Sequence, residues 1–484
     1  MSQVATENPP PASKPRKSID LWHSVRDWLN TSSAIQVATE IGFKSPAFVE
    51  AHAKNLSKEH ELFQAIFSAN VYLVPLDHNL FDEKSASERP LVARFLDTQL
   101  PSDTEGSLYI HELEITNKTN TSVPKKDLVV IHGYMAASGY FLKNVEQLAS
   151  SYPNMVVHVI DLPGFGNSAR PKFPSQLLKL PSSASVLDEI NQITGAEDWF
   201  IDKLELWRLA KGLKQFDLIG HSMGAYLSSC YLMKYNKQSD GSLLVQKFAL
   251  VSPMGTEPSE LSLINKGDFQ FDHSEVQSNP LKELLAAQDN EHNGINQDFV
   301  KLWERLGRPK FPNNVFLRTI WRKNISPFQV LQWLGPFYSK ILSLWSFQRF
   351  HNLQSNSKEE LADNTELILK LHDYSFSIFN QYQASGELAI TKFINHEILP
   401  RLPLSERGFV EFLIDHKIQT IWLYGENDWM NSKGGQYCVD KIDKLEPQLA
   451  TFETIPNAGH HLYLDNSSAF NQTVEKFFGY SNRT

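Results

Sequence analysis

Short apolar runs recur along the chain from about residue 125, and they alternate with Gly-rich turns and helical stretches. Such runs stand at residues 125–134, 154–166, 216–224, 245–253 and 418–428. Each predicts a buried strand that leads into a loop, because strands covered on both faces carry near-continuous apolar side chains. Strands that alternate with helices predict a doubly wound, mostly parallel α/β sheet.

Two other segments depart from this pattern. Residues 107–115 alternate apolar and polar positions, which predicts an antiparallel strand at the start of the sheet. Between Val251 and about Leu404 the strand signals stop, and helical periodicity predicts an insertion above the sheet. The predicted layout is a tail with an amphipathic helix at 1–60, a core at 61–254 and 405–484, and a helical lid at 255–404.

The first 17 residues read as a Pro-rich, unstructured tail. Behind it, Ile19, Trp22, Val25, Trp28 and Leu29 recur at helical spacing. Two Trp residues on one short helix face suit docking on the core or insertion into a membrane interface. The pattern leaves both readings open.

Composition narrows the class of protein. Hydrophobic residues make up 41% of the chain and aromatic residues 11%, enough for a sizeable core. The net charge of −9 argues against general nucleic-acid binding. Two cysteines, Cys230 and Cys438, argue against a disulfide scaffold and cannot build a zinc site alone.

Targeting signals are weak. No apolar run approaches the roughly 20 residues of a membrane-spanning helix, and the N-terminus lacks the apolar stretch of a secretory signal. Its Ser and basic residues suit a mitochondrial transit peptide, whereas Glu7 and the Pro run do not.

The sequence GHSMG at residues 220–224 carries the strongest chemical signal. It follows an apolar strand and precedes a helical run, which is the setting of a nucleophile elbow. Gly220 and Gly224 allow the sharp turn, and Ser222 is lifted to a helix N-terminus where the dipole favours developing negative charge. A chance Gly-Ser-Gly turn is the alternative, and the strand–turn–helix setting disfavours it.

A nucleophilic serine needs a base, an acid and an oxyanion hole. Asp428 follows a predicted strand and His460 stands in a later Gly-containing loop, so they complete the order Ser…Asp…His. Glu426 is the competing acid. The backbone N–H groups of Tyr134 and Met223 are the predicted oxyanion donors.

Other roles are predicted for the residues that follow His460, for His132 and for the Gly-rich turn at 161–168. His460 and Asp465 form an H-x-x-x-x-D pattern, but residues five apart on a helix lie about 140° apart around its axis and share no face. Asp465 is instead predicted to cap the final helix, and His461 to be solvated or capping. His132 is predicted to organise the oxyanion loop. The Gly-rich turn at 161–168 lacks the lysine of a phosphate-binding loop and is predicted to line the active-site mouth.

Together HGY, DLPGFGNS, GHSMG, YGEND and AGHHLYLD resemble the α/β-hydrolase superfamily, over about residues 94–251 and 404–480. Residues 324–337 and 460–472 are similar to the subgroup containing the mammalian N-acyl-phospholipid lipase, the triglyceride-lipase co-activator and the fungal mitochondrial cardiolipin-specific deacylase. The resemblance implies an α/β-hydrolase fold with a helical lid, a lipid acyl ester as substrate and peripheral membrane attachment. It also implies a mitochondrial location on the inner membrane, with the cytoplasm or a lipid droplet as the alternative.

An independent feature lies in the predicted lid. From Arg305 to Lys358 there is no acidic residue, and basic and aromatic residues are interleaved. Aromatic side chains suit a membrane interface, and each basic residue near an anionic surface contributes about 1 kcal/mol. The alternative is a packed aromatic lid with solvated charges. The candidate membrane-binding residues are Arg318, Trp321, Arg322, Lys323, Trp333 and Trp345.

The expected function is therefore a cofactor-free serine hydrolase of the phospholipase A type, with cardiolipin as the leading substrate and monolyso-cardiolipin as its product. No metal and no nucleic acid are expected. A lysophosphatidic acid acyltransferase and a non-catalytic lipid-binding co-activator of another lipase are the alternatives. A small-ester hydrolase would leave the basic lid unexplained.

Overall fold

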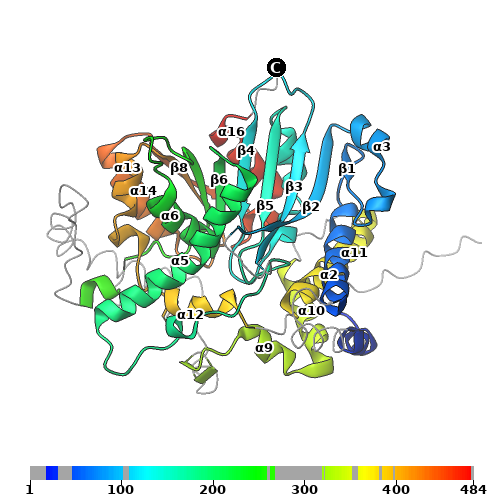
Figure 1. Cartoon of the computed structure of the whole chain (residues 1–484), viewed down its shortest axis with the longest axis horizontal. Coiled ribbons are helices and arrows are strands. Elements are labelled where there is room, and N and C mark those ends of the chain that lie inside the picture. Colours follow the sequence, from blue (N-terminus) through cyan, green and yellow to red (C-terminus); the bar gives the residue numbers. More distant parts are fainter. Residues whose placement is uncertain are drawn as a thin grey trace, which may run out of the picture.

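A computed structural model gives the architecture of the chain (Figure 1). The residues it describes are 18–30, 46–101, 108–258, 262–266, 319–320, 322–350, 358–380, 384–395 and 398–480.

The described residues form one nine-stranded sheet in the order β1-β2-β3-β5-β4-β6-β7-β8-β9. β3 is antiparallel to both of its neighbours, and the strands from β5 to β9 run parallel to one another. The predicted doubly wound sheet and its antiparallel strand are confirmed. The strands are β1 (Val71–Leu73), β2 (Leu91–Gln99), β3 (Tyr109–Asn117), β4 (Lys126–Ile131), β5 (Met155–Ile160), β6 (Asp217–His221), β7 (Lys247–Val251), β8 (Gln419–Gly425) and β9 (Ala450–Ile455).

The apolar runs of the central strands supply two cores, one on each face of the sheet. Along β4, Val129 and Ile131 pack into one apolar cluster while Leu128 and Val130 pack into the other. Alternate side chains of a strand point to opposite faces, so a strand buried on both faces must be apolar throughout. All six residues of β5 are buried, and five of them are apolar; the exception, His158, lies 3.0 Å from the Glu112 carboxylate.

Helices cover both faces. α5 (Val186–Lys211), α6 (Met223–Tyr235), α13 (Phe409–Asp415) and α14 (Ser432–Leu445) supply residues to one cluster. The other cluster takes residues from α2 (Pro46–Gln64), α4 (Val145–Ser150), α15 (Leu462–Asp465) and α16 (Ser467–Phe478). A short helix, α3 (Glu83–Glu88), precedes β2.

The chain between β7 and α13 forms a helical cap. Its described helices are α9 (Pro327–Gln332), α10 (Tyr338–Arg349), α11 (Lys358–Phe379) and α12 (Ile390–Phe393), with the 3-10 turns η5 (Gly335–Phe337) and η7 (Gly386–Ala389). In Figure 1, α9, α10 and α12 lie together beyond one end of the strands. That end carries the carboxyl termini of the parallel strands, because Gly386 packs against Pro163 in the loop after β5.

A buried ion pair fixes the cap to the core. Arg170 follows the loop after β5, and its guanidinium donates a 2.9 Å hydrogen bond to the Glu387 carboxylate in η7. The same carboxylate accepts hydrogen bonds from the Ser326 hydroxyl at 2.6 Å and from the Ser385 N–H at 3.0 Å. Its side chain is 1% exposed, so the charge is compensated inside the protein rather than by water.

The N-terminal amphipathic segment forms a helix over residues 21–30 that docks on α10. The Ile19 N–H donates to the Ser343 hydroxyl at 3.1 Å, and the Ser24 hydroxyl donates to the Pro336 carbonyl at 2.6 Å. Downstream, α2 runs through residue 60, where the sequence placed a domain boundary. The domain boundaries stay predictions.

We expect the Glu387→Ala variant to lose about 3–5 kcal/mol of unfolding free energy, because it removes the buried carboxylate that compensates the Arg170 charge. Urea unfolding monitored by tryptophan fluorescence measures this change. The matched control is Glu366→Ala on α11, whose side chain is 71% exposed and pairs with Lys370 only at 3.9 Å. The control should change the unfolding free energy by less than about 0.5 kcal/mol. An equally small change for Glu387→Ala would contradict the conclusion that the Arg170–Glu387 ion pair fixes the cap to the core.

Candidate active site

Ser222 lies in a sharp turn between β6 and α6. Its backbone has φ 54° and ψ −118°, a strained conformation for a residue with a side chain. A Cβ on Gly224 would lie 2.3 Å from the His132 carbonyl oxygen, and one on Gly220 would lie 2.7 Å from the Ala225 Cα. Only glycine therefore fits on either side of the turn, as the spacing of GHSMG predicted.

The turn brings the Ser222 hydroxyl to a histidine that follows β9. His460 Nε2 lies 3.1 Å from Ser222 Oγ, and His460 Nδ1 lies 3.0 Å from Asp428 Oδ1. A carboxylate can only accept, so Nδ1 carries the proton and Nε2 is left to accept from the hydroxyl. The three residues are 6%, 9% and 3% exposed in the order Ser222, His460, Asp428. This arrangement can transfer a proton from the serine to the imidazole.

Asp428 rather than Glu426 faces the imidazole. Its Oδ1 also accepts from the Met430 N–H at 2.9 Å, and its Oδ2 accepts a short hydrogen bond from the Ser252 hydroxyl. Glu426 instead accepts from the Asn457 N–H at 2.8 Å, near the surface. Ser252 immediately follows β7, and its position at the end of a parallel strand is the signal that could have found it.

The two predicted oxyanion donors stand beside the serine. Met223 is the first residue of α6, so its N–H has no partner within the helix. Tyr134 follows β4 in a loop packed on the nucleophile, because a Cβ on Gly133 would lie only 2.8 Å from Ser222 Cβ. Among the described residues, none accepts a hydrogen bond from either N–H. Both groups are therefore free to bind an oxyanion.

His132 holds the oxyanion loop. Its Nδ1 donates to the Gly133 carbonyl at 2.7 Å, and its Nε2 accepts from the Leu162 N–H at 2.9 Å. Burial lowers the pKa of His132 to about 4, so the ring is neutral and keeps this tautomer at physiological pH. The ring thus joins the oxyanion loop to the Gly-rich loop that begins at Asp161.

The sequence analysis did not predict two aromatic rings that lie beside His460. His221 donates from Nε2 to the His460 carbonyl at 3.0 Å, and its ring lies 4.8 Å from the His460 ring. Burial, and then the nearby His460, lower the pKa of His221 well below its ordinary value. Trp429 lies on another side of the base, with ring centroids 4.6 Å apart. Both side chains restrict the orientation of the imidazole.

Of two predictions for the segment after His460, one holds only in part and the other is wrong. His461 is the N-cap residue of α15, but its side chain makes no cap hydrogen bond, and its partly exposed ring packs 5.0 Å from His221 with Nδ1 buried. Asn466, not Asp465, caps α16 by accepting from the Ala469 N–H. Asp465 turns back instead and accepts from the Gly459 N–H at 2.9 Å. These contacts join segments that are distant in sequence, which helix-cap patterns do not report.

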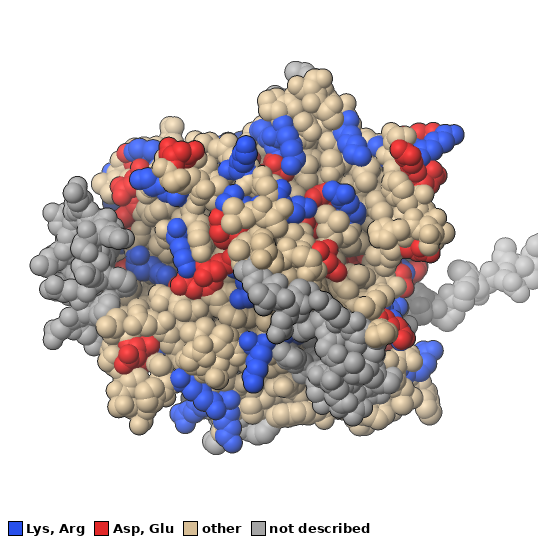
Figure 2. Space-filling view, viewed as in Figure 1, with Lys and Arg blue, Asp and Glu red and all other residues tan. Residues whose placement is uncertain are grey.

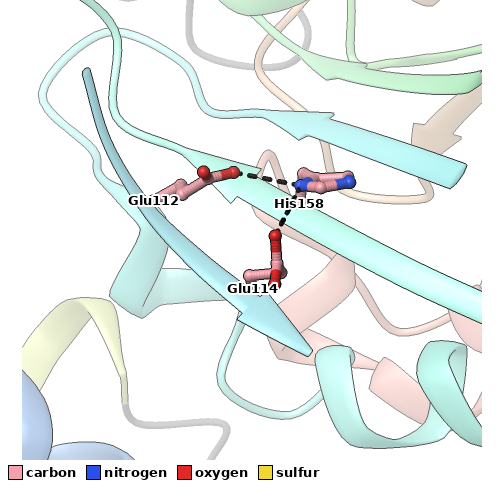
Figure 3. Close-up of side chains that lie close together, drawn as sticks. All are labelled: Glu112, Glu114 and His158. Carbon is pink, nitrogen blue, oxygen red and sulfur yellow. Dashed lines mark hydrogen bonds and ion pairs between the residues drawn. The ribbon is translucent and has the colours of Figure 1, made fainter. Parts of the chain in front are cut away.

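A second cluster of ionisable groups lies on β3 and β5. Figure 3 shows Glu112 and Glu114 pointing toward His158, and their ligand atoms lie within 4.8 Å of one another, close enough to hold a metal ion. The Lys211 ammonium lies 2.7 Å from each carboxylate. Burial raises the pKa of Glu114, but Lys211 and His158 outweigh it and hold that pKa at about 2. Lys211 and His158 thus compensate the two carboxylates in an ion-pair network, and we assign no metal to this cluster.

The candidate membrane-binding residues fall into three groups. Arg318 and Trp321 lie outside the described residues. Arg322, Lys323 and Trp333 are exposed, Trp333 by 63%. Trp345 is half-buried and packs against the rings of Phe350 and Phe379, so it belongs to the interior of the cap.

Exposed apolar side chains gather on the helix over residues 21–30 and on the segment from α9 to α10. We call this set the apolar face: Leu21, Trp22, Trp28, Leu29, Trp333, Leu334, Phe337, Ile341 and Leu344. Figure 2 shows a small group of Lys and Arg side chains at the lower edge of the molecule, below α9 in Figure 1. Of the helices that the structure describes, none is both long and apolar enough to cross a bilayer.

Comparison with known proteins identifies the family. Residues 127–467 match the model of the alpha/beta hydrolase fold, and this segment runs from β4 to the start of α16. The chain belongs to the alpha/beta hydrolase fold family. The matched segment contains Ser222, Asp428 and His460.

Three known proteins are each less than 30% identical to this chain, and each match covers 72% of it. A protein of Oryza sativa subsp. japonica named "Probable 1-acylglycerol-3-phosphate O-acyltransferase" is 28% identical over 66% of its own length. The "1-acylglycerol-3-phosphate O-acyltransferase ICT1" of Saccharomyces cerevisiae is 26% identical over 81% of its length. The "(Lyso)-N-acylphosphatidylethanolamine lipase" of Mus musculus is 26% identical over 78%. The chain thus spans just under two thirds of the rice relative.

Proposed function

We propose that the chain is a serine hydrolase that removes acyl chains from membrane phospholipids. The observation that carries this proposal is the unbroken hydrogen-bonded path from Ser222 Oγ through His460 to Asp428, 3.1 Å and 3.0 Å long at its two steps. The free N–H groups of Tyr134 and Met223 beside the serine support it.

In the proposed reaction, Ser222 Oγ attacks the acyl carbonyl carbon while His460 Nε2 accepts the hydroxyl proton. The Tyr134 and Met223 N–H groups stabilise the negative charge on the carbonyl oxygen. Asp428 keeps the proton on His460 Nδ1 and stabilises the imidazolium. The intermediate collapses as His460 gives its proton to the departing glycerol oxygen, and water then hydrolyses the acyl-enzyme by the same route. These steps require no cofactor.

Two arguments support a phospholipid as substrate. The relatives' names refer to N-acylphosphatidylethanolamine and 1-acylglycerol-3-phosphate, both of which are phosphate-bearing lipids. The apolar face, with Arg322 and Lys323 exposed in the same cap, suits an anionic membrane surface. We propose cardiolipin as the leading substrate and the mitochondrial inner membrane as the location, on the resemblance of residues 324–337 and 460–472.

Acyl transfer is the second candidate. It is favoured by the acyltransferase names of the rice and yeast relatives. The same acyl-enzyme serves both reactions, and the outcome depends on whether water or a lipid hydroxyl attacks it.

Purified protein on liposomes of cardiolipin, phosphatidylcholine, phosphatidylethanolamine and triglyceride distinguishes these functions. We expect wild type to release free fatty acid and monolyso-cardiolipin, and Ser222→Ala to be slower by about 10⁴-fold or more, because the nucleophile is lost. The control Ser468→Ala alters an exposed serine on α16 and should retain wild-type rates.

Mass spectrometry of the lipid products, with and without acyl-CoA and lysophosphatidate, is the readout. New phosphatidate formed only when both are added would select the acyltransferase. Full hydrolysis by Ser222→Ala would refute the assignment of the nucleophile.

The apolar face gives a separate prediction about membrane attachment. Trp22 is 79% exposed and Trp333 is 63% exposed, so burying either in a bilayer removes a large apolar surface from water. Each Trp→Ala change should weaken sedimentation with cardiolipin-containing vesicles by about tenfold. Leu445→Ala on α14 is the control, because Leu445 is 70% exposed but lies away from this face. Equal sedimentation of the Trp variants and the control would contradict this attachment.

A further inference from the structure

A cavity of about 690 Å³ lies between the end of α10 and the two loops that carry Asp428 and His460. Its walls include Trp345 and Arg349 from α10, Asn427 beside Asp428, and Gly459 beside His460. Cavities of this size commonly hold small molecules. Asn427 and Gly459 are the residues directly before Asp428 and His460 in the sequence, so this cavity adjoins the loops that carry the acid and the base.

Arg349 is the cationic residue in the cavity wall, and its bonding capacity is largely unused. Its NH1 group lies 3.4 Å from Asp465 Oδ1, longer than the 2.7–2.9 Å typical of a charge-assisted hydrogen bond. Its NH2 group is buried without a hydrogen-bond partner among the described residues. A guanidinium has five N–H donors, and because the NH2 group is enclosed by protein, the donors left for a ligand in the cavity are those on NH1 and Nε.

Asp465 fixes the position of this guanidinium rather than neutralising it fully. Its Oδ2 accepts from the Gly459 N–H at 2.9 Å, so the carboxylate is shared between the cap and the loop of the base. The Arg349 side chain is 19% exposed, against 4% for Asp465, and therefore presents an accessible edge. The Arg349 charge also acts on the active-site rings: after burial, it is the next cause that lowers the pKa of His461.

We propose that Arg349 binds the phosphate of the lipid whose acyl ester reaches Ser222, which rests on the proposed function. A planar guanidinium matches the tetrahedral oxygens of a phosphate by paired N–H contacts. The side chain of Asn427 adds a neutral donor in the same wall. Arg349 thereby becomes a specificity-determining residue, and the His460–Asp465 pattern acquires a role: Asp465 orients the phosphate-binding arginine.

Two oleoyl substrates that differ only by the phosphate test this assignment: 1-oleoylglycerol-3-phosphate and 1-oleoylglycerol. The ratio of their kcat/KM values should fall about tenfold or more in Arg349→Gln, because the variant loses the charge-assisted hydrogen bonds to the phosphate. Arg349→Lys keeps the charge but loses the paired geometry, so its ratio should fall less. Arg89→Gln, an exposed arginine near β2, should keep the wild-type ratio. An unchanged ratio in Arg349→Gln would overturn the proposal, and so would equal losses on both substrates, which indicate general disruption.

A binding experiment separates this inference from the proposed catalysis. In the non-reacting Ser222→Ala protein, calorimetry should show that Arg349→Gln weakens binding of 1-oleoylglycerol-3-phosphate about tenfold. This arm holds even if wild type hydrolyses neither lipid. Inorganic phosphate is titrated in parallel and should bind far more weakly than the lipid. Binding of inorganic phosphate as tight as that of the lipid would assign a free-phosphate site and overturn the head-group assignment.

Discussion

The strained turn at Ser222 is the constraint on which the rest of the site depends. A residue with a side chain at φ 54° is unfavourable, and the surrounding packing must hold it there. The Ser222 N–H donates to the Val251 carbonyl of β7 at 2.9 Å, and the Ser222 carbonyl accepts from the Met254 N–H. Backbone from the neighbouring strand therefore fixes the turn. The hydroxyl then stands at the N-terminus of α6, where helix geometry leaves the Met223 N–H free.

The parallel sheet supplies the other groups for the same reason. Parallel strands end at one edge, so loops that are distant in sequence meet there. The loops after β8 and β9 touch directly, since a Cβ on Gly425 would lie 2.3 Å from the Gly459 carbonyl oxygen. That contact sets Asp428 against His460. The carboxyl edge is also where the cap attaches, so the site lies between rigid strands and a helical layer.

Much of this arrangement can be predicted from the sequence, and there is a physical reason why the remaining features cannot. The central strands are buried on both faces and therefore read as apolar runs. Only the two end residues of β9, Ala450 and Ile455, are buried, so this strand carries no apolar run and its sequence does not predict it. Ser222, Asp428 and His460 can each be predicted from the residues around them, because each stands in a loop that follows a strand. Ser252, His221 and Trp429 act through contacts with residues far away in the chain, and their own neighbours in sequence do not report those contacts.

In the lid too, part of the arrangement can be predicted from the sequence and part depends on packing. Its aromatic and basic composition predicts a lipid-facing surface, but composition alone does not separate Trp333, which is exposed, from Trp345, which packs inside the cap. Arg349 was one of many basic residues in the sequence, and only the fold brings it to Asp465. Charge counts thus indicate a kind of partner, whereas packing decides which charge faces it.

The most direct test of the account is to map the residue modified by a fluorophosphonate, a reagent that reacts with activated serines. We predict that one phosphonyl group is added per chain, that peptide mass spectrometry places it on Ser222, and that lipid hydrolysis stops in proportion. Label on another serine, or continued hydrolysis by fully labelled protein, would contradict the account.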